Sequence, residues 1–382
     1  MNKELQQAIG SRLFAHIDAK STDRAAEEMS VEEREYCDPD RARLETELVA
    51  RNPRMVASSH ELAGSGRFLR VDGGSGSILV VRQADGRIRA FRNVCRHRCA
   101  AVEERPAGVT KSFSCPYHGW TYGLDGALIN LPDQAESFTN VNLGDVGLQE
   151  LPAAERHGMI WVLERGDGPL EIEKYLGSDI DDELSDLDLN SYQLYRAETF
   201  HQPANWKLIM DGFLEVYHVR YLHTRTVGKI ALSNIMTVDN LDGHMRLVTA
   251  RKDLQELRML PEDKFDLHRG VILTYILLPS TVVVYVRDHV EVWSIVPQRD
   301  DPTHCVVTLR FLIPDSPASQ KESDYWQRNW DTVVGAVHDE DWAMARQIQL
   351  NLDGSSKTSM TLGKNELALH RFHTFVRDGV GE

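Results

Sequence analysis

Basic residues, long apolar runs and cysteines are all scarce in this sequence. Lys and Arg number 43 against 58 Asp and Glu, which gives a net charge of −15. Such a chain lacks the basic patch that binding to nucleic acid or to an anionic membrane requires. Its longest apolar run, residues 271–286, is interrupted by Pro279, Ser280 and two threonines and is too short for a membrane span. We therefore expect no nucleic-acid or membrane partner.

The amino terminus and the cysteines indicate a cytoplasmic protein. Residues 1–14 mix Lys, Glu and Gln with apolar residues, unlike a secretory signal peptide. The chain has five cysteines, and two of them belong to a motif described below. The remaining three, Cys37, Cys99 and Cys305, are an odd number and do not suggest a disulfide framework. Free thiols of this kind are typical of a reducing compartment.

Two short motifs each combine a cysteine with a histidine. Cys95 and His97 are followed, after seventeen residues, by Cys115 and His118. Two thiolates and two imidazoles are a donor set that can hold tetrahedral zinc. Zinc motifs, however, usually pair Cys with Cys and His with His, whereas each of these arms holds one of each. The mixed arms favour a [2Fe–2S] cluster in which both cysteines bind one iron and both histidines bind the other.

Composition divides the chain into three parts. Residues 1–52 are polar and rich in Glu, Arg and Ala, which predicts a helical arm that packs on a later domain. Residues 53–165 hold short β-branched runs between Gly-containing turns, which predicts a small all-β domain around the Cys–His motifs. The turn-forming stretch 166–169 opens the third part, 166–382. We interpret an acidic segment, 179–188, as a solvated connection.

The third part contains a second group of candidate ligands. Asn205 is suited to cap a helix, and the helix predicted to follow it has an apolar stripe. Asp211, Glu215 and His218 fall beside that stripe, on one face of the same helix. Two carboxylates and an imidazole next to a buried face are costly unless they are paired or bind something.

His223 follows His218 by five residues. On an unbroken α-helix their side chains point about 140° apart. They can therefore share a metal only if the helix ends or distorts between Val219 and Leu222. The alternative is that both are ordinary polar or core histidines.

The end of the chain adds a candidate carboxylate ligand. Residues 247–313 have the pattern of consecutive strands in an antiparallel sheet, and a long helix is predicted from about Ser323. The apolar stripe of this helix is interrupted at Asp341, whereas Asp339 and Glu340 point elsewhere on the helical wheel. A carboxylate at an apolar position is either paired with a cation or a metal ligand, and we favour the ligand.

His218, His223 and Asp341 together match the triad of two histidines and one carboxylate found in non-haem Fe(II) oxygenases. Three protein ligands leave coordination positions for O₂ and water. The segment CPYHGWTY at residues 115–122 looks like the second arm of a Rieske cluster loop. With both motifs in one chain, the sequence resembles the catalytic α-subunit of a Rieske non-haem iron oxygenase of the aromatic-ring-hydroxylating type, over nearly its whole length.

The resemblance implies an α+β fold with an N-terminal all-β Rieske [2Fe–2S] domain and a C-terminal helix-grip domain containing a curved antiparallel sheet. The cluster ligands that it implies are Cys95, His97, Cys115 and His118. The ligands that it implies for a mononuclear Fe(II) are His218, His223 and Asp341. It also implies a homotrimer, and a ferredoxin or flavin reductase that delivers electrons from NAD(P)H.

Three positions depart from the family pattern. Glu215 stands where the family usually has Asp, as in the branch that acts on quaternary amines such as carnitine. Asp211 stands where many ring dioxygenases have Asn. Cys99 replaces a Gly of the cluster loop, and we interpret it as a packed bystander thiol, with a thiol vulnerable to oxidation as the alternative. By the resemblance, Glu215 and Asp211 belong to the catalytic machinery, and Glu215 can link His218 to His118 of a neighbouring chain.

The implied function is that of a terminal oxygenase component, which uses O₂ and reductase-supplied electrons on a small organic substrate. Glu215 favours monooxygenation, by hydroxylation or by oxidative N- or O-dealkylation of an aromatic or amine compound. One alternative is cis-dihydroxylation of an aromatic ring. Another is a Rieske electron carrier without oxygenase activity, which would leave the residues after 165 unexplained. A quaternary amine substrate would call for an aromatic cage, with the candidates Tyr275, Tyr285 and Trp293.

Overall fold

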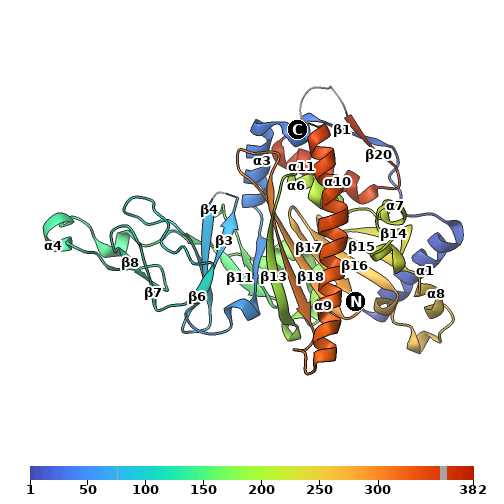
Figure 1. Ribbon diagram of the computed structural model, residues 1–382, viewed down its shortest axis with the longest axis horizontal. Coiled ribbons are helices and arrows are strands. Elements are labelled where there is room, and N and C mark those ends of the chain that lie inside the picture. The colour runs from blue at the N-terminus through green and yellow to red at the C-terminus, as the bar shows by residue number, and fades with distance from the viewer. Residues whose placement is uncertain (75, 353–358) are drawn as a thin grey trace. The chain divides into compact units, whose positions relative to one another are not determined.

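The computed structural model divides the chain into two compact units (Figure 1). Residues 49–175 form the smaller unit, and residues 1–48 together with 176–382 form the larger one. The predicted N-terminal arm and the predicted third part of the chain thus share one unit. The residues that the structure describes are 1–74, 76–352 and 359–382.

The smaller unit consists mainly of short strands. Their bounds are β2 Arg54–Ser58, β3 Arg67–Gly73, β4 Gly76–Arg82, β5 Ile88–Arg92, β6 Ala107–Val109, β7 Ser112–Ser114, β8 Thr121–Gly123, β9 Leu128–Asn130, β10 Glu150–Leu151, β11 Ala153–Arg156 and β12 Met159–Val162. The strands pair in three sheets of order β10-β5-β4-β3-β6, β11-β12-β2 and β7-β8-β9. The short helices are η1 Ser59–Leu62, α4 Gln134–Ser137 and η2 Leu143–Asp145.

Strand β4 shows why this small unit holds two cores. Its four consecutive apolar residues are all buried, and successive side chains of a strand point to opposite faces. Ile78 and Val80 pack in one core, whereas Leu79 and Val81 pack in the other. The second core also contains Cys95 and Cys115, so the Cys–His loops are built on its packing.

The larger unit is organised on one antiparallel sheet of seven strands. Their bounds are β13 Gln193–Gln202, β14 Ala231–Leu241, β15 His244–Arg251, β16 Val271–Leu277, β17 Thr281–Val286, β18 His289–Pro297 and β19 Cys305–Ile313. The order β13-β19-β18-β17-β16-β15-β14 places β13 and β14 at opposite edges. The chain between β13 and β14 therefore crosses from one edge of the sheet to the other, and this crossing segment carries Asp211, Glu215, His218 and His223.

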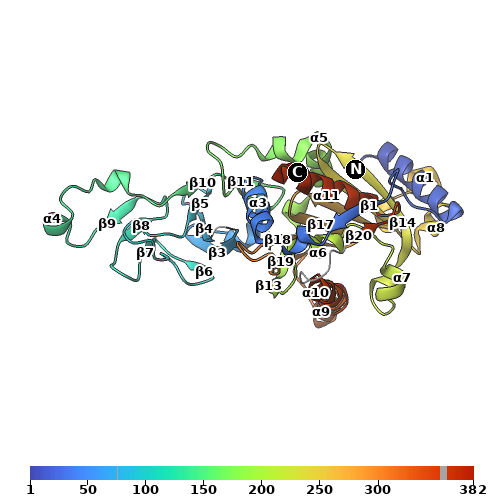
Figure 2. The same cartoon turned by 90° about the horizontal axis from the view of Figure 1, so that it is seen from above.

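Helices accompany this sheet. Their bounds are α1 Lys3–Ala19, α2 Arg34–Cys37, α3 Pro39–Ala50, α5 Ile172–Asp186, α6 Trp206–Asp211, α7 Val219–Leu222, α8 Leu254–Leu257, α9 Gln320–Val334, α10 Trp342–Asn351 and α11 Leu367–Val380. A π-helical segment, η7 Gly335–Asp341, joins α9 to α10, and the short 3₁₀ segments are η3 Leu189–Ser191, η4 Val227–Lys229, η5 Glu262–Lys264 and η6 Leu267–Arg269. Figures 1 and 2 together show α9 and α10 running along one face of the sheet. A two-stranded sheet pairs β1 Met29–Glu32 with β20 Ser359–Leu362.

The N-terminal arm fixes the position of α6. Glu45 of α3 is buried and accepts a hydrogen bond from the indole Nε1 of Trp206 at 2.7 Å. The same carboxylate accepts two bonds from Nζ of Lys207, at 2.6 and 2.7 Å. The side chain of Asn205 caps α6 as predicted, by accepting from the backbone N–H of Lys207. The start of the crossing segment is thus anchored to α3 through charged, buried contacts.

Two predictions about secondary structure are wrong. The acidic segment 179–188 is no solvated connection, because most of it belongs to α5, where Ile180, Glu183 and Leu184 are buried. The helix after Asn205 ends at Asp211, much earlier than its apolar stripe predicts.

No helix of the described residues is both long and apolar enough to cross a bilayer.

Candidate metal centres

The two Cys–His loops of the smaller unit have the same backbone geometry. The N–H of Cys95 donates to the carbonyl of Ala100 at 2.8 Å, and the N–H of Cys115 donates to the carbonyl of Trp120, also at 2.8 Å. Each loop closes with a second bond, from Cys99 N–H to Cys95 and from Gly119 N–H to Cys115, both at 3.0 Å. Two equivalent turns of this kind present equivalent ligands to a shared group.

The donor atoms of these loops fit a [2Fe–2S] cluster. Both cysteines are buried, whereas His118 is exposed and His97 half-buried, with 4.5 Å between the centroids of the two imidazoles. Nδ1 of His97 is buried without a hydrogen-bond partner, which is costly for a ring nitrogen that binds nothing. Two cysteines and two histidines are the donor set of a Rieske cluster, in which the histidines bind one iron and the cysteines the other.

Aromatic residues support the cluster loops. Trp120 stacks on His97 with 4.9 Å between ring centroids and 6° between the ring planes. The hydroxyl of Tyr122 accepts a hydrogen bond from the backbone N–H of Arg96 at 3.0 Å and lies 3.3 Å from Sγ of Cys95. Cys99 is exposed and not packed as predicted. It has a positive φ of 61°, like Gly119 at 71° in the other loop.

The second centre lies where the crossing segment meets the helix η7. Nε2 of His218 lies 3.1 Å from Nε2 of His223, and Oδ1 of Asp341 lies 3.6 Å and 3.0 Å from these two atoms. A first-row metal about 2.1 Å from each donor, with right angles between the bonds, would set the donors about 3 Å apart. The three predicted ligands are therefore brought together at the spacing that one octahedral ion requires.

The local fold explains this convergence. Helix α7 is a single turn, Val219–Leu222, with His218 immediately before it and His223 immediately after it. The turn itself is regular, since the backbone N–H groups of Leu222 and His223 donate to the carbonyls of His218 and Val219, but the chain is not helical before His218 and leaves helical geometry at His223, whose ψ is 36°. For the two histidines to share a metal, the sequence predicts a break of the helix within residues 219–222. The structure instead places the ends of the helical segment on either side of these residues.

Outer carboxylates hold both imidazoles by Nδ1. Nδ1 of His218 donates to Glu215, and Nδ1 of His223 donates to Glu340 at 2.7 Å. When Nδ1 of each ring carries the proton, the two Nε2 atoms face one another with their lone pairs. A cation bound between them stabilises this arrangement. Burial by itself lowers the pKa of both histidines, but the adjacent carboxylates outweigh it, so the pKa of each is raised above its ordinary value.

Glu340 is a site residue that the sequence pattern missed. On a regular helix it points about 100° away from Asp341, so the helical wheel separates the two acids. The π-helical turns of η7 change that spacing, so both acids reach His223, one at each ring nitrogen. Thr226 also donates its hydroxyl proton to Glu340. Its position next to Asp341 was the signal in the sequence that could have identified Glu340 as a site residue.

Asp211 is engaged away from the three ligand atoms. Its carboxylate accepts from the hydroxyl of Tyr36 at 3.1 Å and lies 3.0 Å from Nε2 of His373. Tyr36 and His373 are both buried, so Asp211 joins the N-terminal arm and α11 to the end of α6. This contact gives Asp211 a positioning role for the crossing segment.

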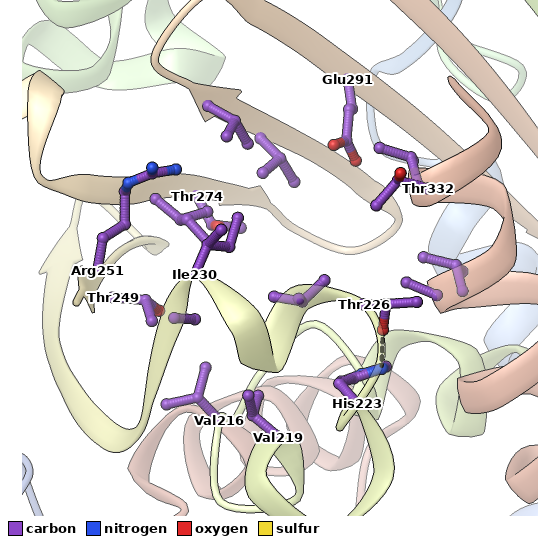
Figure 3. Close-up of a pocket in the computed structure, with 18 of the residues that line it drawn as sticks. Val216, Val219, His223, Thr226, Ile230, Thr249, Arg251, Thr274, Glu291 and Thr332 are labelled. Carbon is purple, nitrogen blue, oxygen red and sulfur yellow. Dashed lines mark hydrogen bonds between the residues drawn. The ribbon is translucent and has the colours of Figure 1, made fainter. Parts of the chain in front are cut away.

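A cavity of about 490 Å³ opens beside the second centre. His218, His223 and Asp341 line it together with apolar residues of the crossing segment, the sheet and α9, such as Phe213, Val284 and Val333. Figure 3 shows His223 and Val219 on one wall and Thr274 and Glu291 on the sheet wall. Its size is that of a small-molecule site.

The described residues that line the cavity do not form the aromatic cage that a quaternary amine substrate would call for. The described residues that line the cavity include two aromatic side chains, Phe213 and Tyr325. None of the three candidates Tyr275, Tyr285 and Trp293 is among them. Tyr275 and Trp293 are fully buried, and each donates a hydrogen bond to a buried glutamate, at Glu183 and Glu291 respectively.

A cluster-binding β unit joined to a unit with a two-histidine, one-carboxylate centre defines a Rieske-type non-haem iron protein. Residues 52–152 match the model of the Rieske [2Fe-2S] domain, and residues 189–382 match that of the ring hydroxylating alpha subunit, catalytic domain. The chain therefore belongs to the ring-hydroxylating alpha-subunit family, whose cofactors are a [2Fe–2S] Rieske cluster and a mononuclear iron. This confirms the predicted family and α+β fold class.

Similar proteins include both monooxygenases and dioxygenases. The chain is 32% identical over 200 residues to the glycine betaine monooxygenase oxygenase subunit of Chromohalobacter salexigens, covering 52% of this chain and 42% of that protein. It is 31% identical over 188 residues to the chlorobenzene dioxygenase subunit alpha of a Cupriavidus species, covering 48% and 42%. The matches thus span less than half the length of these two relatives.

A solved structure shares the fold over most of the chain. A crystal structure of the quaternary ammonium Rieske monooxygenase CntA superposes with a TM-score of 0.77 at 18% sequence identity. The match covers 92% of this chain and 95% of that one. At this level of identity the likeness concerns the fold alone.

Proposed function

We propose that this protein is a terminal oxygenase component that hydroxylates a small organic substrate with O₂. The observation that carries the proposal is the convergence of His218 Nε2, His223 Nε2 and Asp341 Oδ1 on the wall of the cavity. A three-ligand centre open to an apolar cavity can hold iron and leaves room for O₂ and a substrate. An electron carrier would need neither the centre nor the cavity.

The residues have distinct tasks in this proposal. Cys95, His97, Cys115 and His118 would hold the cluster, and His218, His223 and Asp341 would hold the mononuclear iron. When bound, the cluster supplies single electrons and the iron supplies O₂ activation. Glu215 and Glu340 fix the tautomers and ring orientations of the two histidines, and the apolar lining excludes water from the bound substrate.

We favour monooxygenation, in which one oxygen atom enters a C–H bond and the other leaves as water, with two electrons and two protons consumed. Glu215 supports this choice, since the resemblance places Glu at that position in the quaternary-amine branch. The similarity to a glycine betaine monooxygenase oxygenase subunit agrees with it. The substrate class that follows is an amine or aromatic compound. Ring cis-dihydroxylation would instead place both oxygen atoms in the product.

The electrons would come from NAD(P)H through a ferredoxin or flavin reductase. We propose a homotrimer in which Glu215 of one copy links His218 to the exposed His118 of the next. The exposure of His118 and the contact of Glu215 with His218 support this link. We also propose a cytoplasmic location, because the three cysteines outside the cluster motif are an odd number that suggests no disulfide framework, as is typical of a reducing compartment.

Iron content and oxygen consumption test this function together. A Rieske cluster holds two irons, so an oxygenase should contain about three per chain and a carrier about two. With a generic reductase, the substrate should stimulate NADH-dependent O₂ uptake, and ¹⁸O₂ should label the product with one atom. Two irons per chain, or no stimulation by any of a broad set of amines and aromatics, would contradict the proposal.

A further inference from the structure

A buried carboxylate faces the cavity without belonging to the metal centre. Glu291 of β18 is 6% exposed and lines the cavity. Figure 3 shows it on the sheet wall, across the cavity from His223. Its carboxylate accepts a hydrogen bond from Nε1 of Trp293 at 3.0 Å and lies 3.3 Å from Nε2 of His289. A carboxylate has about four acceptor positions, so Glu291 retains capacity for a donor from a substrate.

The surroundings of Glu291 leave the wall negatively charged. His289 lies between two carboxylates, 3.0 Å from Asp288 at Nδ1 and 3.3 Å from Glu291 at Nε2. An imidazole can donate to acceptors at both nitrogens only when it is protonated. Burial lowers the pKa of His289, but the bonds to Asp288 and Glu291 outweigh it and raise the pKa. Two carboxylates and one imidazolium give the group a net charge of about −1 by this count. Tyr325 adds a neutral hydroxyl donor at Asp288.

The basic residues of the lining do not cancel this charge. Arg251 is engaged by Asp253 through Nε at 3.1 Å and Nη2 at 3.2 Å. The other basic side chains of the lining are exposed, namely Arg225, Lys229 and Arg287. Exposed charges are screened by water and salt, whereas a buried carboxylate acts through a low dielectric. Glu291 therefore dominates the electrostatics of the sheet wall.

The negatively charged sheet wall suits a cationic substrate, and the groups on this wall determine which kind of cation it binds. A quaternary ammonium has no N–H and is best held by an aromatic cage, which the described lining lacks. A protonated amine donates N–H bonds, and a buried carboxylate is the acceptor that suits it. We propose that Glu291 is the specificity-determining residue of the cavity and binds the N–H of a protonated primary, secondary or tertiary amine. This inference rests on the proposed function and narrows its substrate class.

Four matched probes test the inference on the iron-loaded enzyme. Benzyldimethylamine, protonated near neutral pH, is compared with its neutral carbon analogue isobutylbenzene. Benzyltrimethylammonium and its neutral analogue neopentylbenzene form the second pair. Equilibrium dialysis without reductant gives the dissociation constants. The tertiary amine should bind roughly 10- to 100-fold more tightly than isobutylbenzene, as expected for a charge-assisted hydrogen bond, and more tightly than the quaternary ammonium.

A pair of variants locates the source of the preference. Glu291→Gln keeps the shape and can still accept from Trp293, yet it should remove most of the preference for the amine over isobutylbenzene. Glu198→Gln removes a carboxylate from β13 that is paired with Arg196 outside the cavity lining, and it should keep the preference. Melting temperatures of both variants establish that they are folded.

The outcomes separate the inference from the proposed function. The inference is supported if the wild type prefers the amine, Glu291→Gln loses this preference and Glu198→Gln keeps it. Equal binding of isobutylbenzene or of the quaternary ammonium by the wild type overturns it, even if the glutamine variant does not fold. If the protein contains about three irons and oxidises other compounds while the amine preference is missing, the inference alone fails. If it contains about two irons, the proposed function fails.

Discussion

The carboxylate of Glu340 lies 2.7 Å from Nδ1 of His223 and accepts a hydrogen bond from it. The opposite nitrogen of the same ring lies 3.0 Å from Asp341. Two consecutive acids therefore hold the two sides of one imidazole, one as a candidate ligand and one as the orienting carboxylate. Carboxylates that orient a ligating histidine contribute about 10- to 100-fold to metal affinity.

Glu340→Gln should accordingly lower the affinity of the mononuclear site for Fe(II) by roughly 10- to 100-fold. The neutral amide is a weaker acceptor and no longer stabilises a positive charge on the ring and metal. Competition against a chelator measures the affinity. Asp339→Asn is the control, because the Asp339 side chain is 72% exposed and contacts His338 instead. Equal losses of Fe(II) affinity in both variants would attribute the effect to the removal of a negative charge near the site rather than to the contact with His223.

Asp341→Ala should empty the mononuclear site and leave the cluster in place. The variant removes one of three converging donors in the larger unit, whereas the cluster loops belong to the smaller unit. Iron content should fall from about three to about two per chain, with the visible absorption of the cluster unchanged and turnover lost. Asp339→Ala should keep both metals and activity. The reverse pattern would show that Asp339 is the ligand.

The sequence predicted which side chains converge better than it predicted the path of the chain around them. Asp341 was recognisable because a carboxylate interrupted an apolar stripe. The contact between Glu215 and His218 was also predicted, but from a continuous helix that does not exist. The helix ends at Asp211, and Glu215 instead accepts from the backbone N–H of Tyr217 and of His218 in the turn before α7. A turn built on a side chain has no periodic signal.

The pairing of strands far apart in the sequence was the other feature that the sequence pattern could not predict. The strands from β15 to β19 follow one another and were visible as apolar β-branched runs, yet β13 pairs with β19 as an edge strand across about a hundred residues of intervening chain. The acidic segment was misinterpreted for a different reason. Its acidic residues suggested exposure to solvent, whereas the burial of Ile180 and Leu184 within the larger unit depends on tertiary contacts.

Cys99→Gly should stabilise the protein slightly. Cys99 has a φ of 61°, a conformation that costs a non-glycine residue about 1–2 kcal/mol relative to glycine. Glycine also gains entropy in the unfolded chain, so the net gain should be about 0.5–1 kcal/mol at most. Thermal unfolding of the iron-loaded protein measures it. Cys99→Ser keeps the strained backbone and should give no gain. A gain of equal size in the serine variant would attribute the effect to the thiol.

The buried ion cluster around Glu164 should make stability depend on pH. Burial raises the pKa of Glu164, but Arg54 and Arg92 outweigh it, and the pKa is lowered below its ordinary value. Because the folded pKa is lower than the unfolded one, the stabilisation is present above the unfolded pKa, about 4.3, and is lost as the pH falls through the folded pKa. At neutral pH, Glu164→Gln should cost roughly 3–5 kcal/mol by leaving two buried arginines without their carboxylate.

Urea unfolding at a series of pH values tests the linkage. Stability should fall as the pH drops below about 5 in the wild type, and less steeply in Glu164→Gln. Glu173→Gln is the control, because Glu173 is 70% exposed and pairs with Arg156 at the surface. It should leave both the stability and its pH dependence nearly unchanged. An identical acid slope in wild type and Glu164→Gln would exclude Glu164 as the source.

Glu215→Gln should slow electron delivery even when both metal sites are filled. Because Glu215 orients His218 as Glu340 orients His223, the variant should also bind Fe(II) more weakly and is compared at saturating Fe(II). In the proposed trimer, Glu215 links His218 to His118 of the neighbouring copy, and the amide would weaken both hydrogen bonds. At saturating Fe(II), metal content and oligomeric state should be those of the wild type. In a single turnover with O₂ and substrate, the pre-reduced cluster should be oxidised far more slowly, as followed by its visible absorption. Electron transfer is then limited by the altered link between copies. Asp339→Asn should oxidise its cluster at the wild-type rate. Unchanged kinetics in Glu215→Gln, or full activity in a proven monomer, would rule out the link and leave Glu215 with the orientation of His218 alone.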